Sequence, residues 1–133
     1  MNIFKKLFNK KSSDYNIKKN SESLESKSYD EKNSIQVDRN LNSIEKEQKR
    51  EIEVAIKEYE QNIDEGFEGN HPYDRLAIIY RKNKDYDNEI RVLNRGIEIF
   101  NRLSKSSPRQ DIKPKLEKFK KRLEKAEELK NTR

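Results

Sequence analysis

The segment from Tyr73 to Phe100 constrains the fold of this chain more than any other part of it. Its first half places four apolar side chains at intervals of three and four residues, the spacing of one helix face: Tyr73, Leu76, Ala77 and Tyr80. After a polar turn at 83–85, the second half carries a broader apolar stripe: Ile90, Leu93, Ile97 and Phe100, with Val92, Ile99 and Leu103 on a second edge. The pattern predicts two amphipathic helices, the second packed between neighbours.

A further helix is predicted before this hairpin, over 43–64. Asn42 and Glu45 form its expected capping pair, and Gly66 follows the helix where a left-handed backbone suits glycine. Apolar residues recur along it at helical spacing: Ile52, Ala55, Ile56, Tyr59 and Ile63. Pro72 fits the first turn of the next helix, where its missing N–H costs nothing.

A last helix is predicted over 112–130, with Asp111 as its N-cap. Its apolar stripe also has helical spacing: Leu116, Phe119, Leu123, Ala126 and Leu129. No part of 42–130 alternates as a strand would. The sequence therefore predicts an all-α domain of about four helices over 42–130.

The N-terminal part of the chain differs from this domain. Residues 12–41 are rich in Ser, Asn, Lys and acids without a sustained apolar period, and we expect a disordered linker there. Residues 1–11 carry four lysines and no acid, with an apolar helical face opposite the lysines: Ile3, Phe4, Leu7 and Phe8. Such a basic amphipathic segment suits docking on a membrane surface, and an idle terminus is the alternative.

Composition limits the function classes. Only 30% of the 133 residues are hydrophobic and 42% are charged, so part of the chain cannot bury enough apolar area to stay ordered. The chain has no Cys, which excludes disulfides and the usual structural zinc sites. No secretory signal or spanning apolar run is present, so we expect a cytoplasmic protein, with a peripheral position at the inner face of the membrane if residues 1–11 dock there.

The hairpin resembles a tetratricopeptide repeat (TPR). Tyr73, Leu76, Ala77 and Tyr80 match the aromatic, Leu–small and Tyr positions of the family's first helix. The turn Lys84-Asp85-Tyr86-Asp87 is similar to the family's Gly-Asp-Tyr-Asp/Glu turn. On the second helix Gly96 fills a small position, whereas Glu89 stands where Ala is usual, Leu93 replaces the aromatic residue, and Asn101 replaces the late Pro.

A weak internal repeat supports the resemblance. Ala55-Ile56 and Tyr59 precede Glu89-Ile90 and Leu93 by one TPR period, which is about 34 residues. The helix 43–64 therefore looks like the second half of an upstream repeat, and 112–130 like a closing helix. The alternative is an unrelated bundle of αα-hairpins. So short an array predicts marginal stability, a homodimer, or a domain stabilised by its partner.

Catalytic chemistry is not predicted. His71 is the only histidine and has no nucleophile or second ligand near it in sequence. Gly66 and Gly69 lack the context of a phosphate-binding loop. We expect no enzyme activity, no cofactor and no bound metal.

The resemblance implies a protein-binding adaptor, because the first helix of each TPR pair lines a concave groove. Its groove-facing positions in this chain are His71, Asp74, Arg75, Ile78, Arg81 and Lys82. The arginines favour a protein or peptide partner that carries carboxylates, which guanidinium groups bind in a bidentate fork. A solvated helix face is the alternative.

The competing hypothesis is a nucleic-acid-associated accessory protein of a bacterium or phage. Residues 111–133 contain nine Lys or Arg and five Asp or Glu. Phosphate would be contacted by the basic residues of the last helix: Lys115, Lys118, Lys121, Arg122 and Lys125. Four glutamates on the same helix weaken this hypothesis.

Overall fold

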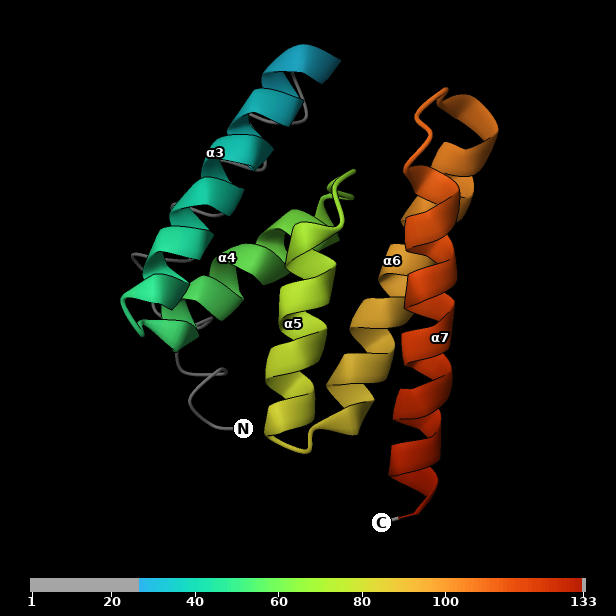
Figure 1. Ribbon diagram of the computed structural model, residues 1–133. Helices are drawn as coiled ribbons and strands as arrows, with labels where there is room; N and C mark the ends of the chain where they lie inside the picture. Colours follow the sequence, from blue (N-terminus) through green and yellow to red (C-terminus); the bar gives the residue numbers. More distant parts are fainter. Residues whose placement is uncertain (1–26, 133) are drawn as a thin grey trace. The chain divides into compact units, whose positions relative to one another are not determined.

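The computed structural model describes residues 27–132, which contain five α-helices and no strand. The helices are α3 (Tyr29–Gln48), α4 (Ile52–Asp64), α5 (His71–Lys82), α6 (Tyr86–Ser106) and α7 (Ile112–Asn131) (Figure 1). The all-α expectation is confirmed for this part of the chain. The chain divides into two compact units, of which the first ends at Asp64 and the second begins at Glu65.

Helix α3 differs from the prediction in extent. It begins after Ser28, so residues 29–41 of the expected linker are helical, and residues 12–26 lie outside the described residues. The expected cap Asn42 is inside α3, where its Nδ2 donates to Glu58 Oε2 over 2.7 Å. Ser28 is the actual N-cap, because its Oγ accepts from the Glu31 N–H and donates to the Glu31 carboxylate.

The expected helix 43–64 is broken at 49–51, between α3 and α4. Arg50 takes a left-handed backbone with φ of 63°. The Glu51 N–H bonds to Lys46 O over 2.8 Å, and the Arg50 N–H to Glu47 O over 3.0 Å. This pair of bonds is the Schellman arrangement that ends a helix, here with Arg in the place where glycine is usual.

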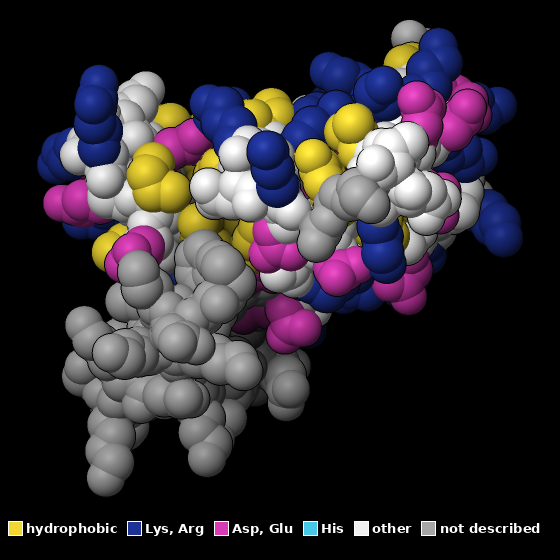
Figure 2. Space-filling model, turned by 90° about the horizontal axis from the view of Figure 1, so that it is seen from below, with side chains coloured by type: hydrophobic (Ala, Val, Ile, Leu, Met, Phe, Trp, Pro, Cys, Tyr) yellow, Lys and Arg dark blue, Asp and Glu magenta, His cyan; other side chains and the backbone are white. Residues whose placement is uncertain are grey.

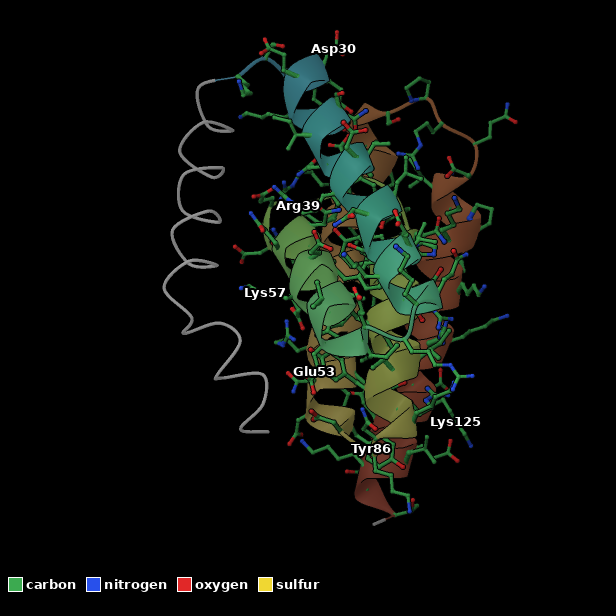
Figure 3. All side chains as sticks on the ribbon, turned by 90° about the vertical axis from the view of Figure 1, so that its left-hand side faces the viewer. Asp30, Arg39, Glu53, Lys57, Tyr86 and Lys125 are labelled. Atoms are coloured by element: carbon green, nitrogen blue, oxygen red, sulfur yellow. The ribbon has the colours of Figure 1, made fainter. Side chains whose placement is uncertain are left out.

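The first unit joins α3 and α4 through a polar seam. Arg39 Nη1 donates to Asn62 Oδ1 over 2.8 Å, and Asn62 Nδ2 donates to the Gln36 carbonyl over 2.9 Å. Gln36, Arg39, Ser43 and Asn62 are all buried. Figure 3 labels Arg39 beside this seam. The packed side of α3 carries polar residues and no apolar stripe, which is why its first half resembles a linker in sequence.

The second unit is a hairpin, α5 and α6, with α7 packed on α6. The three helices alternate in direction, so α5 and α7 run parallel (Figure 1). The bounds of α5, α6 and α7 agree with the predicted helices, and Pro72 lies in the first turn of α5. Gly66 has φ of 78°, as expected for the residue after α4.

An aromatic cluster fills the core of the second unit. The rings of Tyr73, Phe100 and Phe119 meet edge-to-face, with centroid separations of 5.2 to 6.3 Å. The Tyr73 hydroxyl donates to Phe67 O over 2.6 Å, and burial raises the pKa of this hydroxyl. Gly96 leaves room for Phe119, because a Cβ on Gly96 would lie 3.2 Å from its ring. One side chain from each helix therefore holds the three together.

The start of α7 differs from the prediction in one contact. Asp111 occupies the N-cap position, but its side chain makes no capping hydrogen bond. Its carboxylate instead pairs with Arg109 and Lys115, each over 2.8 Å, and these cations hold its pKa well below the usual range. Arg109 also donates to Glu68 O over 2.7 Å, which ties this turn to the loop before α5.

Candidate protein-binding face

The six expected partner-binding residues are all on α5, and the helix divides them into two sets. At 3.6 residues per turn, four of them share one narrow stripe, directly opposite the buried side of α5: His71, Arg75, Ile78 and Lys82. We call this stripe the α5 face. Asp74 and Arg81 lie about a quarter turn away, on the edge of α5 that is next to α7.

The α5 face is partly accessible to solvent. Lys82 is exposed, while His71, Arg75 and Ile78 are half-buried. The face combines a branched apolar side chain with two permanent cations and a histidine. Such a surface can hold an apolar residue next to a carboxylate, which suits a peptide better than a small reacting substrate.

Arg81 is paired with an acid inside the second unit. Its Nε donates to Glu89 Oε2 over 2.6 Å, and the Glu89 side chain is fully buried. Burial raises the pKa of Glu89, and the guanidinium of Arg81 opposes that rise. Glu89 Oε1 is buried without a hydrogen-bond partner among the described residues. Arg81 therefore compensates an acid inside the unit.

Asp74 is also used inside the unit. Arg122 Nη1 of α7 lies 3.4 Å from Asp74 Oδ1, and Asn70 Nδ2 donates to Asp74 Oδ2 over 2.6 Å. Arg81 Nη2 reaches the Arg122 carbonyl over 3.3 Å. These bonds tie α5 to α7 along one edge. Asp74 and Arg81, both expected on the partner-binding surface, therefore also make contacts within the unit.

Helix α7 contributes a basic edge that the prediction of a single-helix site missed. Lys118, Lys121 and Lys125 are exposed and lie on the same side of α7 as Arg122. Lys118 and Lys121 have no ion pair within the part of the chain that the structure describes. Because Arg122 contacts Asp74, this basic edge adjoins α5.

The acids of α7 lie away from Arg122, although Glu128 pairs with Lys125 of the basic edge over 3.5 Å. Helical spacing places them on the opposite side from Arg122: Glu117, Glu124, Glu127 and Glu128. Figure 2 shows Lys and Arg side chains interspersed with Asp and Glu side chains over the visible surface of the described residues. The spacing of the lysines in the sequence already indicated a basic side of α7. Only the contact between Arg122 and Asp74 shows that this side adjoins α5.

Among residues 27–132, no group of three His, Asp or Glu side chains is placed to hold a metal ion. None of the helices described is long and apolar enough to cross a bilayer. The expected membrane-surface residues Ile3, Phe4, Leu7 and Phe8 lie outside the described residues.

Comparisons with known proteins found no relative of this chain. No protein-family model, no curated protein and no solved structure matches this chain.

Proposed function

We propose that this chain is a non-enzymatic adaptor that binds a protein or peptide partner on the α5 face. The observation that carries the proposal is the position of His71, Arg75, Ile78 and Lys82, opposite the packed side of α5 and beside the basic edge of α7. Cations on two adjacent helices favour an acidic segment. Ile78 provides an apolar contact between them.

The proposal includes a TPR-like architecture for both units, each of which contains a hairpin. Its support is that buried positions of α3 and α5 are in register at one TPR period. Arg39 and Ser43 of α3 stand one period before Tyr73 and Ala77 of α5, and all four are buried. In this interpretation α3 is the degenerate first half of the upstream repeat.

The turn between α5 and α6 also supports the repeat. Lys84 has φ of 57° in a Schellman arrangement, with Lys84 N–H to Arg81 O and Asp85 N–H to Tyr80 O both at 2.9 Å. The resembled family has glycine at this position, and a left-handed backbone gives that preference a physical reason. Asp85 then caps α6 by accepting from the Asn88 N–H.

A peptide selection tests the proposed partner. Peptides selected from a random library on the full chain should be rich in Asp and Glu, and their affinity should fall at least tenfold in Arg75→Glu/Lys82→Glu. The matched control is Arg102→Glu/Lys105→Glu, the same change in charge on exposed residues of α6. Equal loss in both variants, or none in either, would refute the α5 face. Arg81 is left intact because it compensates Glu89.

Nucleic-acid binding through α7 is the second candidate, favoured by Lys118 and Lys121 of its basic edge. Of the residues expected to contact phosphate, three are paired with acids: Lys115 with Asp111, Arg122 with Asp74, and Lys125 with Glu128. Binding to a single-stranded DNA oligonucleotide should weaken steeply with salt and be lost in Lys118→Glu/Lys121→Glu. This candidate would be excluded by two results together. The variant would bind the selected acidic peptides with unchanged affinity, and DNA binding by the unmodified chain would not depend on salt.

A peripheral membrane position completes the proposal. Residues 1–11 would dock through Ile3, Phe4, Leu7 and Phe8, with their lysines against anionic lipid. Flotation of the full chain with anionic vesicles should be lost when residues 1–11 are removed. Flotation that persists without them would refute this part alone.

A further inference from the structure

The polarity of α3 is inverted relative to an ordinary surface helix. Its side towards α4 buries Gln36, Arg39 and Ser43, whereas its outward side shows Val37 at 38% and Leu41 at 58% exposure. Ile44, half-buried, continues the same outward stripe one turn later. We call Val37, Leu41 and Ile44 the α3 stripe. Because the three lie next to one another on one face, they form a candidate docking surface.

The charges around the α3 stripe have one sign. Asp30, Asp38 and Glu45 are exposed and lie within about 60° of the stripe around the helix axis. Asp30 and Asp38 make no ion pair among residues 27–132, and Glu45 pairs with Lys49 beyond the helix end. Figure 3 labels Asp30 in the first turn of α3. The basic residues of α3 lie on its other half: Lys32, Arg39 and Lys46.

Residues 1–11 match this surface in charge and length. They carry four lysines and no acid beside the apolar face of Ile3, Phe4, Leu7 and Phe8. The α3 stripe rises about 10 Å along its helix, and the segment from Ile3 to Phe8 would rise about 8 Å if it were helical. An apolar stripe beside acids is complementary to an apolar stripe beside lysines.

The intervening chain is long enough for the contact. Residues 12–28 could extend over roughly 55 Å, while α3 rises only about 23 Å from Tyr29 to Ile44. Because the two elements belong to one chain, docking needs no second molecule and benefits from a high effective concentration.

We propose that residues 1–11 fold back as a helix on the α3 stripe of the same molecule. Ile3, Phe4, Leu7 and Phe8 cover Val37, Leu41 and Ile44, and the lysines of the segment lie beside Asp30, Asp38 and Glu45. In this state the apolar face of the segment is unavailable to a membrane. The inference does not rest on the α5 face, which belongs to the other unit.

Paramagnetic broadening in NMR spectra tests the fold-back in the full chain. The chain has no Cys, so Ser34→Cys supplies a single site for a nitroxide label, one turn before Val37. The amide signals of Phe4, Leu7 and Phe8 should lose more than half their intensity in the labelled chain. Broadening that is absent from residues 1–11 would overturn the proposal.

A mixing experiment and matched variants decide the occupant. Nitroxide-labelled chain that contains no ¹⁵N is mixed with ¹⁵N-enriched chain that carries no nitroxide, and the ¹⁵N signals should not broaden. Broadening in this mixture would mean that a second copy of the chain occupies the α3 stripe, contrary to the proposal. Val37→Gln/Leu41→Gln should restore the signals, whereas Val54→Gln, a valine of α4 that is 39% exposed, should not. Helical circular dichroism of all variants checks that α3 persists. Broadening that survives Val37→Gln/Leu41→Gln in a helical chain would also overturn the proposal.

Discussion

The two units use the same helix-hairpin plan, but their first helices, α3 and α5, bury opposite kinds of side chain. In the second unit, Tyr73 and Ala77 of α5 bury apolar surface, and the aromatic cluster joins three helices. In the first unit, the positions one TPR period earlier hold Arg39 and Ser43, and the buried seam is made of hydrogen bonds. An apolar core is stabilised by the apolar surface that it removes from water. The hydrogen bonds of a polar seam mainly prevent the cost of burying polar groups without partners.

The same register relates the outward surfaces. Val37, Leu41 and Ile44 of the α3 stripe stand one period before His71, Arg75 and Ile78 of the α5 face. The first surface is apolar beside acids, and the second is basic around one isoleucine. If both hairpins descend from one repeat, equivalent positions on their outward faces have diverged in charge.

The largest expected effect concerns the aromatic cluster. Phe119→Ala removes the side chain that contacts both Tyr73 and Phe100, and the cavity should lower the free energy of unfolding of the second unit by about 4 kcal/mol. Urea denaturation followed by circular dichroism measures the change. Leu129→Ala, on a half-exposed residue of the same helix, should cost about 1 kcal/mol or less. Similar losses for the two variants would contradict an apolar core centred on Phe119.

The next effect concerns the buried ion pair of the second unit. Arg81→Met leaves Glu89 buried without its cation and should destabilise the unit by about 3 kcal/mol near neutral pH. Glu89 already has a raised pKa, and removing Arg81 raises it further, so the folded state takes up a proton before the unfolded state as pH falls.

The loss in Arg81→Met should therefore shrink as pH is lowered from neutral towards the ordinary pKa of Glu. Denaturation at several pH values, compared with the unmodified chain, measures this. The double variant Arg81→Met/Glu89→Gln should show little of the pH dependence. A loss that is independent of pH would mean that the charge of Glu89 is not what Arg81 compensates.

A smaller effect is expected at the polar seam of the first unit. Asn62→Leu removes the partner of Arg39 Nη1 and of the Gln36 carbonyl, and it should cost about 2 kcal/mol. Arg39→Met/Asn62→Leu replaces both side chains by apolar ones and should recover most of the loss. Denaturant midpoints of the three chains give the coupling. If the double variant is as unstable as the sum of the single variants, the seam contributes more than mutual satisfaction of polar groups.

The smallest effects compare the two left-handed helix ends. Lys84→Gly and Arg50→Gly each relieve a positive φ, and each should raise stability by up to about 1 kcal/mol. Thermal denaturation measures both. Asn83→Gly, one residue earlier with φ of −89°, is the control and should destabilise. If Asn83→Gly raised stability as much as Lys84→Gly, relief of backbone strain would not explain the increase.

Sequence periodicity predicts the fold where packing is apolar and fails where it is polar. The bounds of α5, α6 and α7 follow from stripes of Leu, Ile and aromatic residues, which recur at helical spacing because one face of each helix is buried. Helix α3 shows no such stripe on its packed side, so 29–41 resembles a linker. The capping pair Ser28 and Glu31 was the one local signal for its start.

The candidate site was predictable only as a helix face. Spacing alone places His71, Arg75, Ile78 and Lys82 opposite the packed side of α5. It does not show that Asp74 and Arg81 are used within the unit, because their partners Arg122 and Glu89 lie 48 and 8 residues away. Long-range ion pairs leave no periodic trace in one sequence.

The pair of Arg81 and Glu89 also restricts how this hairpin can evolve. Losing the arginine first leaves a buried carboxylate uncompensated, and losing the acid first leaves the guanidinium of Arg81 without its closest partner. An ancestor with Ala at position 89 would have had no need of Arg at 81. Among descendants of this sequence, the two positions should therefore change together, and their covariation would identify the hairpin where overall similarity has faded.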